Sequence, residues 1–264
     1  MDTENAVAAS LAVQGLAVKE INGHPFVVTA EGQSVESLEH LLPAPLRRKS
    51  HQQFNEVQSF VDYVDRFRTS NALLIAEPDN HRVGATLDYH AAGADGAAAW
   101  KDHTALLTLR LAPEWTAWNS RNNHHFGQVD FAEFIEQNLP DIAEPDGAQL
   151  KEAVEKMQVN RNVRVASAVN LDSGEIAFTY EDQDNKSKGS AKLPRRLVLG
   201  LPVYKHGTRY RVDAAMRYRL NDGKLSFFYV LQRPDKVAEA AFEGVVTEIA
   251  AGLDMRPLIG VVLR

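Results

Sequence analysis

Residues 72–118 constrain the fold of this chain most strongly, because two stretches within them alternate between apolar and polar side chains. The apolar residues are Val83, Ala85, Leu87 and Tyr89 in the first stretch, and Ala105, Leu107, Leu109 and Leu111 in the second. A period of two places each set on one side of a β-strand. The linker 91–101 is too short for a crossover helix, so the sequence predicts an antiparallel hairpin.

A second β region is predicted from residue 162 onward. Apolar residues alternate over 210–220 and pair back over 225–231, and the Asn-Asp-Gly-Lys sequence between them favours a hairpin turn. The Asp-Ser-Gly sequence at 172–174 predicts another turn. Pro194 and Pro202 favour an edge strand over residues 193–201. Short strands are also expected within 24–30 and 257–264.

The strongest helical pattern covers residues 50–68, where apolar residues recur every three to four positions. Ser50 and Gln53 have the spacing of a capping box at its start. Asp235 is placed to cap a final helix that Gly252 ends. Weaker helical patterns occupy 3–19, 128–138 and 148–157.

These elements predict an α+β fold, built mainly from antiparallel β-hairpins with segregated helices. Strands and helices do not alternate regularly, which argues against a doubly wound parallel sheet. We expect a single unit, 1–264, with one candidate subdivision. It separates a helix-flanked hairpin region, 1–155, from a β-hairpin region with a C-terminal helix, 156–264.

The chain has no cysteine, which excludes disulfides and thiolate chemistry and fits a reducing cytoplasm. No apolar run approaches the roughly 18 residues of a membrane span, and the first residues lack the features of a secretory signal. The net charge of −6 does not favour a nucleic-acid binder that is basic throughout, although it leaves room for a local basic patch.

Asp88, His90 and His103 are candidate metal ligands at the loop end of the first hairpin. Asp88 and His90 share one strand face, and antiparallel pairing places His103 across from them. Imidazole and carboxylate groups can hold zinc or act as a base with an orienting acid. Their spacing matches no metal signature, so polar residues that simply end a strand are the alternative.

Motifs of nucleophilic and nucleotide chemistry are missing from the sequence. It contains no G-x-S-x-G nucleophile elbow, no phosphate-binding loop ending in GK[ST], and no glycine-rich dinucleotide fingerprint. These absences count against the common nucleotide-hydrolysing folds, and the sequence indicates no cofactor.

Four arginines, Arg209, Arg211, Arg217 and Arg219, occupy alternate positions of one predicted strand and therefore share one side of it. Guanidinium groups suit phosphates and also suit carboxylates. The arginines therefore indicate either an anion or nucleic-acid contact, or ion pairing within the chain and between subunits. The negative net charge, and the lack of a known stacking motif beside them, favour ion pairing and assembly.

Segments FNEVQSFVDYVDRF, LDYH, APEWTAW and QVDFAEFIEQNLPDI, starting at residues 54, 87, 112 and 128, resemble the YfdQ-like family of phage and prophage proteins. The resemblance spans most of the chain. It implies a phage or prophage accessory protein in the cytoplasm of a bacterial host, and it supplies no catalytic residues.

Together these features predict a non-catalytic accessory protein that acts as a homo-oligomeric assembly or binding protein, without a membrane partner. One alternative is a nucleic-acid-binding accessory in phage replication or recombination. The other is a metal-dependent hydrolase that uses Asp88, His90 and His103.

Overall fold

The computed structural model describes residues 18–21, 24–27, 43–45, 47–93, 95–156, 178–181, 188–191, 193–221 and 224–262. The chain divides into two compact units, Met1–Arg48 and Lys49–Arg264. In the first unit, β1 (Val18–Ile21) and β2 (His24–Val27) form an antiparallel pair, which confirms the strand predicted within 24–30. The helix predicted over 3–19 falls outside the described residues except for its last two, which belong to β1.

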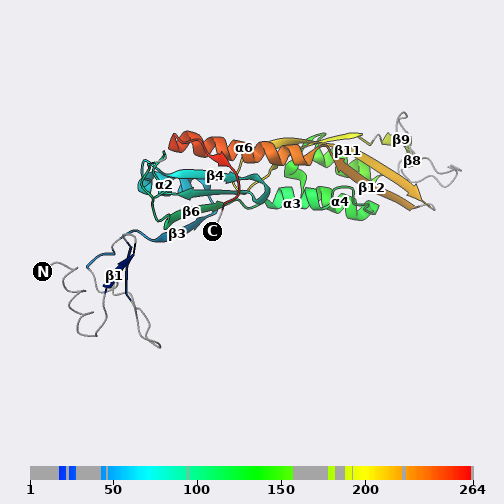
Figure 1. Ribbon diagram of the computed structural model, residues 1–264. Coiled ribbons are helices and arrows are strands. Elements are labelled where there is room, and N and C mark those ends of the chain that lie inside the picture. The colour runs from blue at the N-terminus through cyan, green and yellow to red at the C-terminus, as the bar shows by residue number, and fades with distance from the viewer. Residues whose placement is uncertain are drawn as a thin grey trace. The chain divides into compact units, whose positions relative to one another are not determined.

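A five-stranded sheet of the second unit contains the first predicted hairpin (Figure 1). Its strands are β13 (Leu258–Ile259), β4 (Leu73–Glu77), β5 (Arg82–Thr86), β6 (His103–Thr108) and β3 (Ser50–Phe54), in that order. Neighbours β4, β5 and β6 pair antiparallel, as predicted for β5 and β6. The two outer strands run parallel to their neighbours, so this sheet is mixed.

The helix predicted over 50–68 is shorter than expected, because residues Ser50–Phe54 form β3 and only Val57–Phe67 form the helix α2. The predicted capping box of Ser50 and Gln53 is therefore wrong. Those residues gain backbone hydrogen bonds to β6 instead, and the side chain of Glu56 caps α2 by accepting from the backbone N–H groups of Gln58 and Ser59. The apolar stripe of α2 is buried as expected.

A four-stranded antiparallel sheet forms from β12 (Lys224–Leu231), β11 (Arg209–Asn221), β10 (Arg196–Pro202) and β7 (Ile142–Glu144), in that order. The pairing of β11 with β12 confirms the predicted hairpin, and residues 222–223 of its turn lie outside the described residues. The prediction of an edge strand over 193–201 is wrong, because β10 lies between β11 and β7. Pro194 precedes the strand and Pro202 is its last residue, so neither proline interrupts the ladder.

Four further α-helices are found among the described residues of the second unit: α3 (Pro113–Ser120), α4 (Gln128–Gln137), α5 (Gly147–Glu155) and α6 (Pro234–Leu253). The structure confirms the helices predicted at 128–138 and 148–157. Helix α3 was not predicted, although Pro113 occupies its first turn, where proline is favoured. Arg233 rather than Asp235 occupies the N-cap position of α6, without a side-chain capping hydrogen bond, and the helix continues through Gly252 to end at Leu253.

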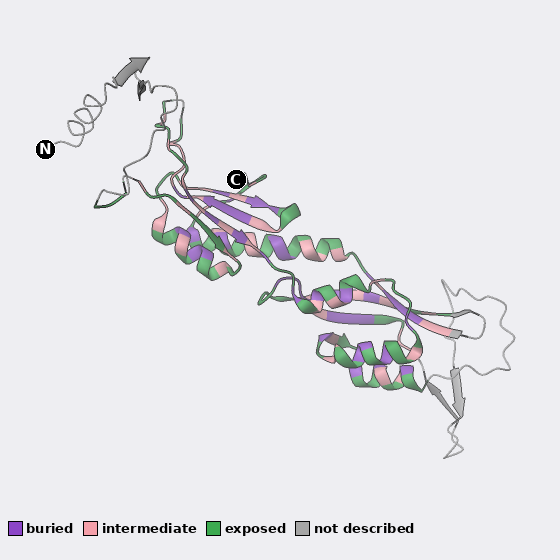
Figure 2. Ribbon diagram, turned by 90° about the horizontal axis from the view of Figure 1, so that it is seen from below, coloured by how far each residue is buried: buried purple, intermediate pink, exposed green. Residues whose placement is uncertain are grey.

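The core of the four-stranded sheet is aromatic, and α3 and α4 cover it on one side (Figure 1). Trp118 of α3 and Phe134 of α4 both pack on Tyr229 of β12, and Phe131 stacks on Phe227. Buried residues lie along the strands and on the inward sides of the helices (Figure 2). Helix α6 contacts both α2 and β11 and so links the two sheets.

The observed architecture confirms the α+β class. One further antiparallel pair, β8 (Phe178–Glu181) with β9 (Lys188–Ala191), belongs to the second predicted β region. The start of that region, residues 162–177 with the turn predicted at 172–174, lies outside the described residues. The subdivision near residue 155 stays a prediction. None of the described helices is long and apolar enough to cross a membrane.

Candidate functional site

Strand β11 presents two different sides. Its even-numbered residues Val212, Ala214 and Met216 are buried beneath the sheet. The four odd-numbered arginines of β11 are exposed on the opposite side. Arg196 of β10 pairs with Ala215 in register, so it lies on that side too. We call this surface the arginine face, defined by Arg196, Arg209, Arg211, Asp213, Arg217 and Arg219.

One end of the arginine face is neutralised within the chain. The Asp213 carboxylate accepts hydrogen bonds from the Arg196 guanidinium, at 2.8 Å from Nη2 and 3.2 Å from Nε. Arg211 Nη2 lies 3.4 Å from the same Asp213 oxygen. The hydrogen bond from Arg196 and the charges of both arginines hold the pKa of Asp213 below its ordinary value. At neutral pH, this ionised carboxylate therefore offsets part of the positive charge of two arginines.

Arg209 contacts Asp141, a carboxylate that is only 4% exposed. The Arg209 guanidinium lies 3.4 Å from Asp141 and also donates to the backbone oxygen of Gly200 at 2.6 Å. Asp141 accepts a second hydrogen bond from the indole of Trp118 at 3.1 Å. Burial nevertheless raises the pKa of Asp141, because removing the charged carboxylate from water outweighs both hydrogen bonds. Arg209 thus anchors the sheet to the segment that follows α4.

The other end of the arginine face carries positive charge that no carboxylate among the described residues offsets. Arg217 and Arg219 are both exposed, and neither side chain forms a hydrogen bond or ion pair with another residue in the described part of the chain. Their partners across the strand pair are Phe228 and Ser226 of β12. Two guanidinium groups therefore remain available to an external anion.

The structure adds His125 to this end of the face, which the sequence did not indicate. The backbone of Phe126 bridges to Phe227, so residues 124–126 run antiparallel beside β12. The His125 ring lies 4.3 Å from the Phe228 ring, and its Nδ1 lies 3.4 Å from the Ser226 hydroxyl. No local pattern in the sequence could have revealed this, because His125 reaches β12 only through the tertiary fold.

An open depression of about 360 Å³ adjoins the neutralised end of the arginine face. It is lined by Arg195, Arg196, Asp213, Ala214, Ala215 and Gln232. The depression leaves room beside the Asp213 carboxylate for a ligand that extends along β11.

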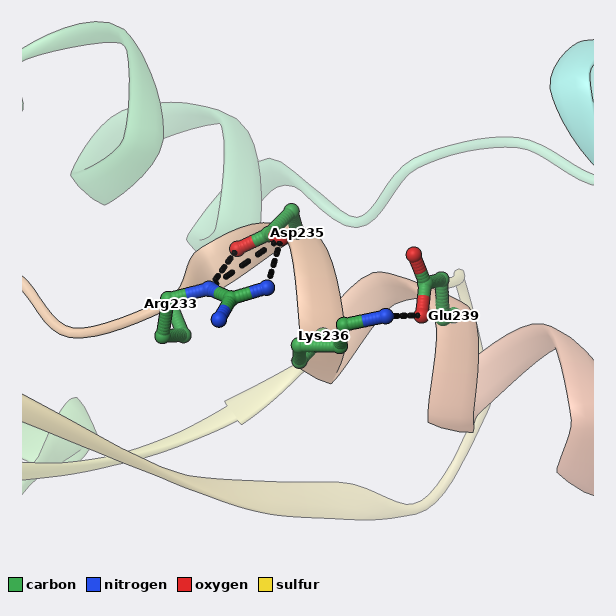
Figure 3. Close-up of polar contacts among 4 residues, drawn as sticks. All are labelled: Arg233, Asp235, Lys236 and Glu239. Carbon is green, nitrogen blue, oxygen red and sulfur yellow. Dashed lines mark hydrogen bonds and ion pairs between the residues drawn. The ribbon is translucent and has the colours of Figure 1, made fainter.

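The basic residues just beyond β12 differ from Arg217 and Arg219, because each has a carboxylate partner (Figure 3). Arg233 binds both oxygens of Asp235, the shortest contact being 2.7 Å, and Lys236 pairs with Glu239. These pairs lie at the start of α6. They serve as a comparison for Arg217 and Arg219, because these cationic side chains already have carboxylate partners within the chain.

The candidate metal ligands form hydrogen bonds with other groups of the chain. Asp88 and His90 follow the end of β5, so the prediction that they share a strand face is wrong. Asp88 accepts from the backbone N–H groups of Asp102 and His103, both at 3.1 Å, and His90 accepts from the backbone N–H of Ala99 at 2.8 Å. The ring of His103 is buried, 2.9 Å from the hydroxyl of Tyr63. Among the described residues, no three such side chains are grouped to hold a metal ion. These contacts favour a structural role for all three.

Comparison with known proteins identifies a family but no characterised relative. No curated protein and no solved structure matches the chain. A family model described as "Uncharacterized conserved protein (DUF2303)" matches residues 2–262, which is nearly the whole sequence. The chain therefore belongs to the DUF2303 family of uncharacterised conserved proteins.

Proposed function

We propose that this protein is a non-catalytic binding protein that contacts the phosphates of a nucleic acid through its arginine face. The resemblance to phage and prophage proteins supports a role as an accessory protein in a bacterial cytoplasm. The observation that carries the proposal is the exposed pair Arg217 and Arg219, which have no carboxylate partner in the described chain. At the other end of the same face, Asp213 already offsets Arg196 and Arg211.

The spacing of the two open arginines suits a linear polyanion. Residues two apart on a strand are separated by roughly 7 Å and point to the same side. A guanidinium group donates two parallel hydrogen bonds to a phosphate, which makes arginine well suited to this contact. The face from Arg209 to Arg219 extends for roughly 33 Å, enough for several phosphates of one strand.

The position of His125 favours nucleic acid over the assembly role expected from the sequence. That expectation rested partly on the lack of a known stacking motif beside the arginines. The fold places the His125 ring on Phe228, directly across the strand pair from Arg217. An aromatic ring beside exposed arginines is typical of surfaces that bind nucleic acid.

Titration of the protein with a fluorescent oligo(dT) at about 50 and 200 mM salt tests the proposal. The Arg217→Ala/Arg219→Ala variant should bind more weakly. Each lost phosphate contact should reduce the dependence of log affinity on log salt by about 0.7, so the double variant should lose about 1.4.

The Arg233→Ala/Lys236→Ala variant is the matched control, since it removes the same charge from side chains that already have partners (Figure 3). If both double variants lose the same amount of oligo(dT) affinity, the loss reflects the change in net charge and not a phosphate contact of Arg217 and Arg219. A wild-type protein that binds no oligonucleotide at low salt would disprove the proposal.

Self-assembly is the second candidate function, and the edge strand β13 favours it. Leu258 is 55% exposed, Ile259 is 71% exposed and Val261 is 64% exposed. Exposed apolar edge strands are surfaces on which a second copy can pair. Light scattering should then give the wild type a molar mass of more than one protomer, and it should give the Leu258→Thr/Ile259→Thr variant a lower mass. If the arginine face serves assembly instead, Arg211→Glu/Arg217→Glu should lower the mass.

A further inference from the structure

The segment at residues 124–126 extends the arginine face by one strand position. Because Phe126 pairs with Phe227, successive residues of this segment point to opposite sides of the sheet. Phe126 is buried in the aromatic core, whereas His125 is exposed on the side that carries Arg217. The fold thus places an imidazole ring on the outer surface from the loop segment between α3 and α4.

Two neighbours hold the His125 ring in place. The phenyl ring of Phe228, itself only 8% exposed, lies 4.3 Å away at an interplanar angle of 35°. The hydroxyl of Ser226 is within hydrogen-bond distance of Nδ1, and it also donates to the backbone oxygen of Arg219. A ring supported in this way loses less conformational freedom on binding than a freely rotating side chain.

Arg217, Phe228 and His125 occupy successive strand positions across the sheet. Two interstrand spacings separate the first from the last, which is roughly 10 Å. From this arrangement we infer that the open end of the arginine face binds single-stranded nucleic acid, with a phosphate on Arg217 or Arg219 and an unpaired base against the His125 ring. The inference rests on the proposed nucleic-acid contact and names its substrate class.

Single strands fit this surface better than duplexes because the ring needs the face of a base. In a duplex, both faces of an interior base are covered by its neighbours, so a ring on the surface of a sheet cannot reach them. Unpaired bases expose those faces and stack on aromatic or histidine rings with little dependence on sequence. A carboxylate of a protein partner would use the arginines alone and would not need His125.

The test compares three probes of equal length: oligo(dT), the same phosphate backbone with abasic sites in place of bases, and a duplex. The variants are His125→Ala, His125→Phe and, as the matched control, His124→Ala. His124 is also exposed, but its ring packs on Phe126. Circular dichroism verifies that each variant folds. Oligo(rU) in a parallel titration distinguishes RNA from DNA.

The expected result is a loss of about tenfold in oligo(dT) affinity for His125→Ala, which is the effect of one lost base stack. His125→Phe should retain most of the affinity, His124→Ala should retain all of it, and abasic binding should not change. Equal affinity for oligo(dT) and the abasic strand, or tighter binding of the duplex, would overturn the inference while leaving the phosphate contact intact. If none of the three probes binds, the proposed function itself fails.

Discussion

The ring of His125 lies 4.3 Å from the ring of Phe228, although the two residues are far apart in the sequence. The contact forms because residues 124–126 run beside β12, which pairs with β11 on its other side. It places a histidine ring next to the two arginines of β11 that have no carboxylate partner in the described chain. The arginine face therefore has two chemically different parts. At one end Asp213 offsets Arg196 and Arg211, and at the other end a histidine ring lies beside Arg217 and Arg219.

Asp213→Asn should strengthen binding of oligo(dT) and make it more sensitive to salt. The substitution keeps the shape of the side chain but removes the negative charge that Arg196 and Arg211 now contact, so both arginines can bind phosphate. Titrations at two salt concentrations measure the change. Asp235→Asn is the control, because Asp235 pairs with Arg233 at the start of α6. An unchanged or lower affinity of Asp213→Asn would contradict the prediction.

Asp141 should make the folded protein less stable as pH rises from about 4. Burial raises the pKa of its carboxyl, so the folded state holds this proton more tightly than the unfolded state does. Its contribution to the free energy of unfolding is therefore largest below the ordinary pKa of 3.8 and falls as pH rises through the raised pKa.

Denaturant unfolding of the wild type and Asp141→Asn between about pH 4 and pH 7 measures this contribution as the difference between the two proteins. As pH rises, the free energy of unfolding of the wild type should fall relative to that of Asp141→Asn. A difference that stays constant with pH would contradict the prediction. Asp141→Ala should cost about 1–3 kcal/mol, because the buried indole N–H of Trp118 then loses its acceptor.

Glu56→Ala should destabilise the protein by about 1 kcal/mol, because α2 loses its N-terminal cap. The Glu56 oxygens accept from the backbone N–H groups of Ser59 and Gln58, at 2.6 and 3.0 Å. Hydrogen bonds from Ser59 lower the pKa of Glu56, so the stabilisation is present at neutral pH and is lost as pH falls through that lowered pKa. Thermal unfolding measures the loss. Glu56→Ser retains a capping oxygen and should cost less; equal losses would rule out a capping role.

Gly84→Ala should displace Val262, which packs on β5 near the end of the chain. A Cβ atom at position 84 would lie 2.6 Å from Cγ1 of Val262, which is too close for two carbon atoms. We expect a loss of about 1 kcal/mol, at the low end for overpacking, because a side chain near the chain end can move. Val262→Ala in the same protein should recover most of that loss. Additive effects of the two substitutions would show that they do not touch.

Local sequence patterns determined the elements whose residues form a regular series. Alternation along β11 and β12 and the turn between them predicted the hairpin, and the apolar repeats at 128–138 and 148–157 predicted α4 and α5. These predictions succeeded because the side-chain periods of strands and helices depend on the local backbone alone. For the same reason, the sequence alone placed the four arginines on one side of β11.

Tertiary pairing decided what those patterns left open. Residues Ser50–Phe54 have a helical pattern, yet they join the sheet because β6 supplies backbone partners. Asp213 partners Arg196 from the neighbouring strand, Asp141 reaches Arg209 from the end of α4, and His125 arrives beside Phe228 from another part of the chain. Groups that are distant in sequence decide which arginines keep no carboxylate partner. Only the folded chain brings such groups within the few ångströms over which hydrogen bonds and ring contacts act.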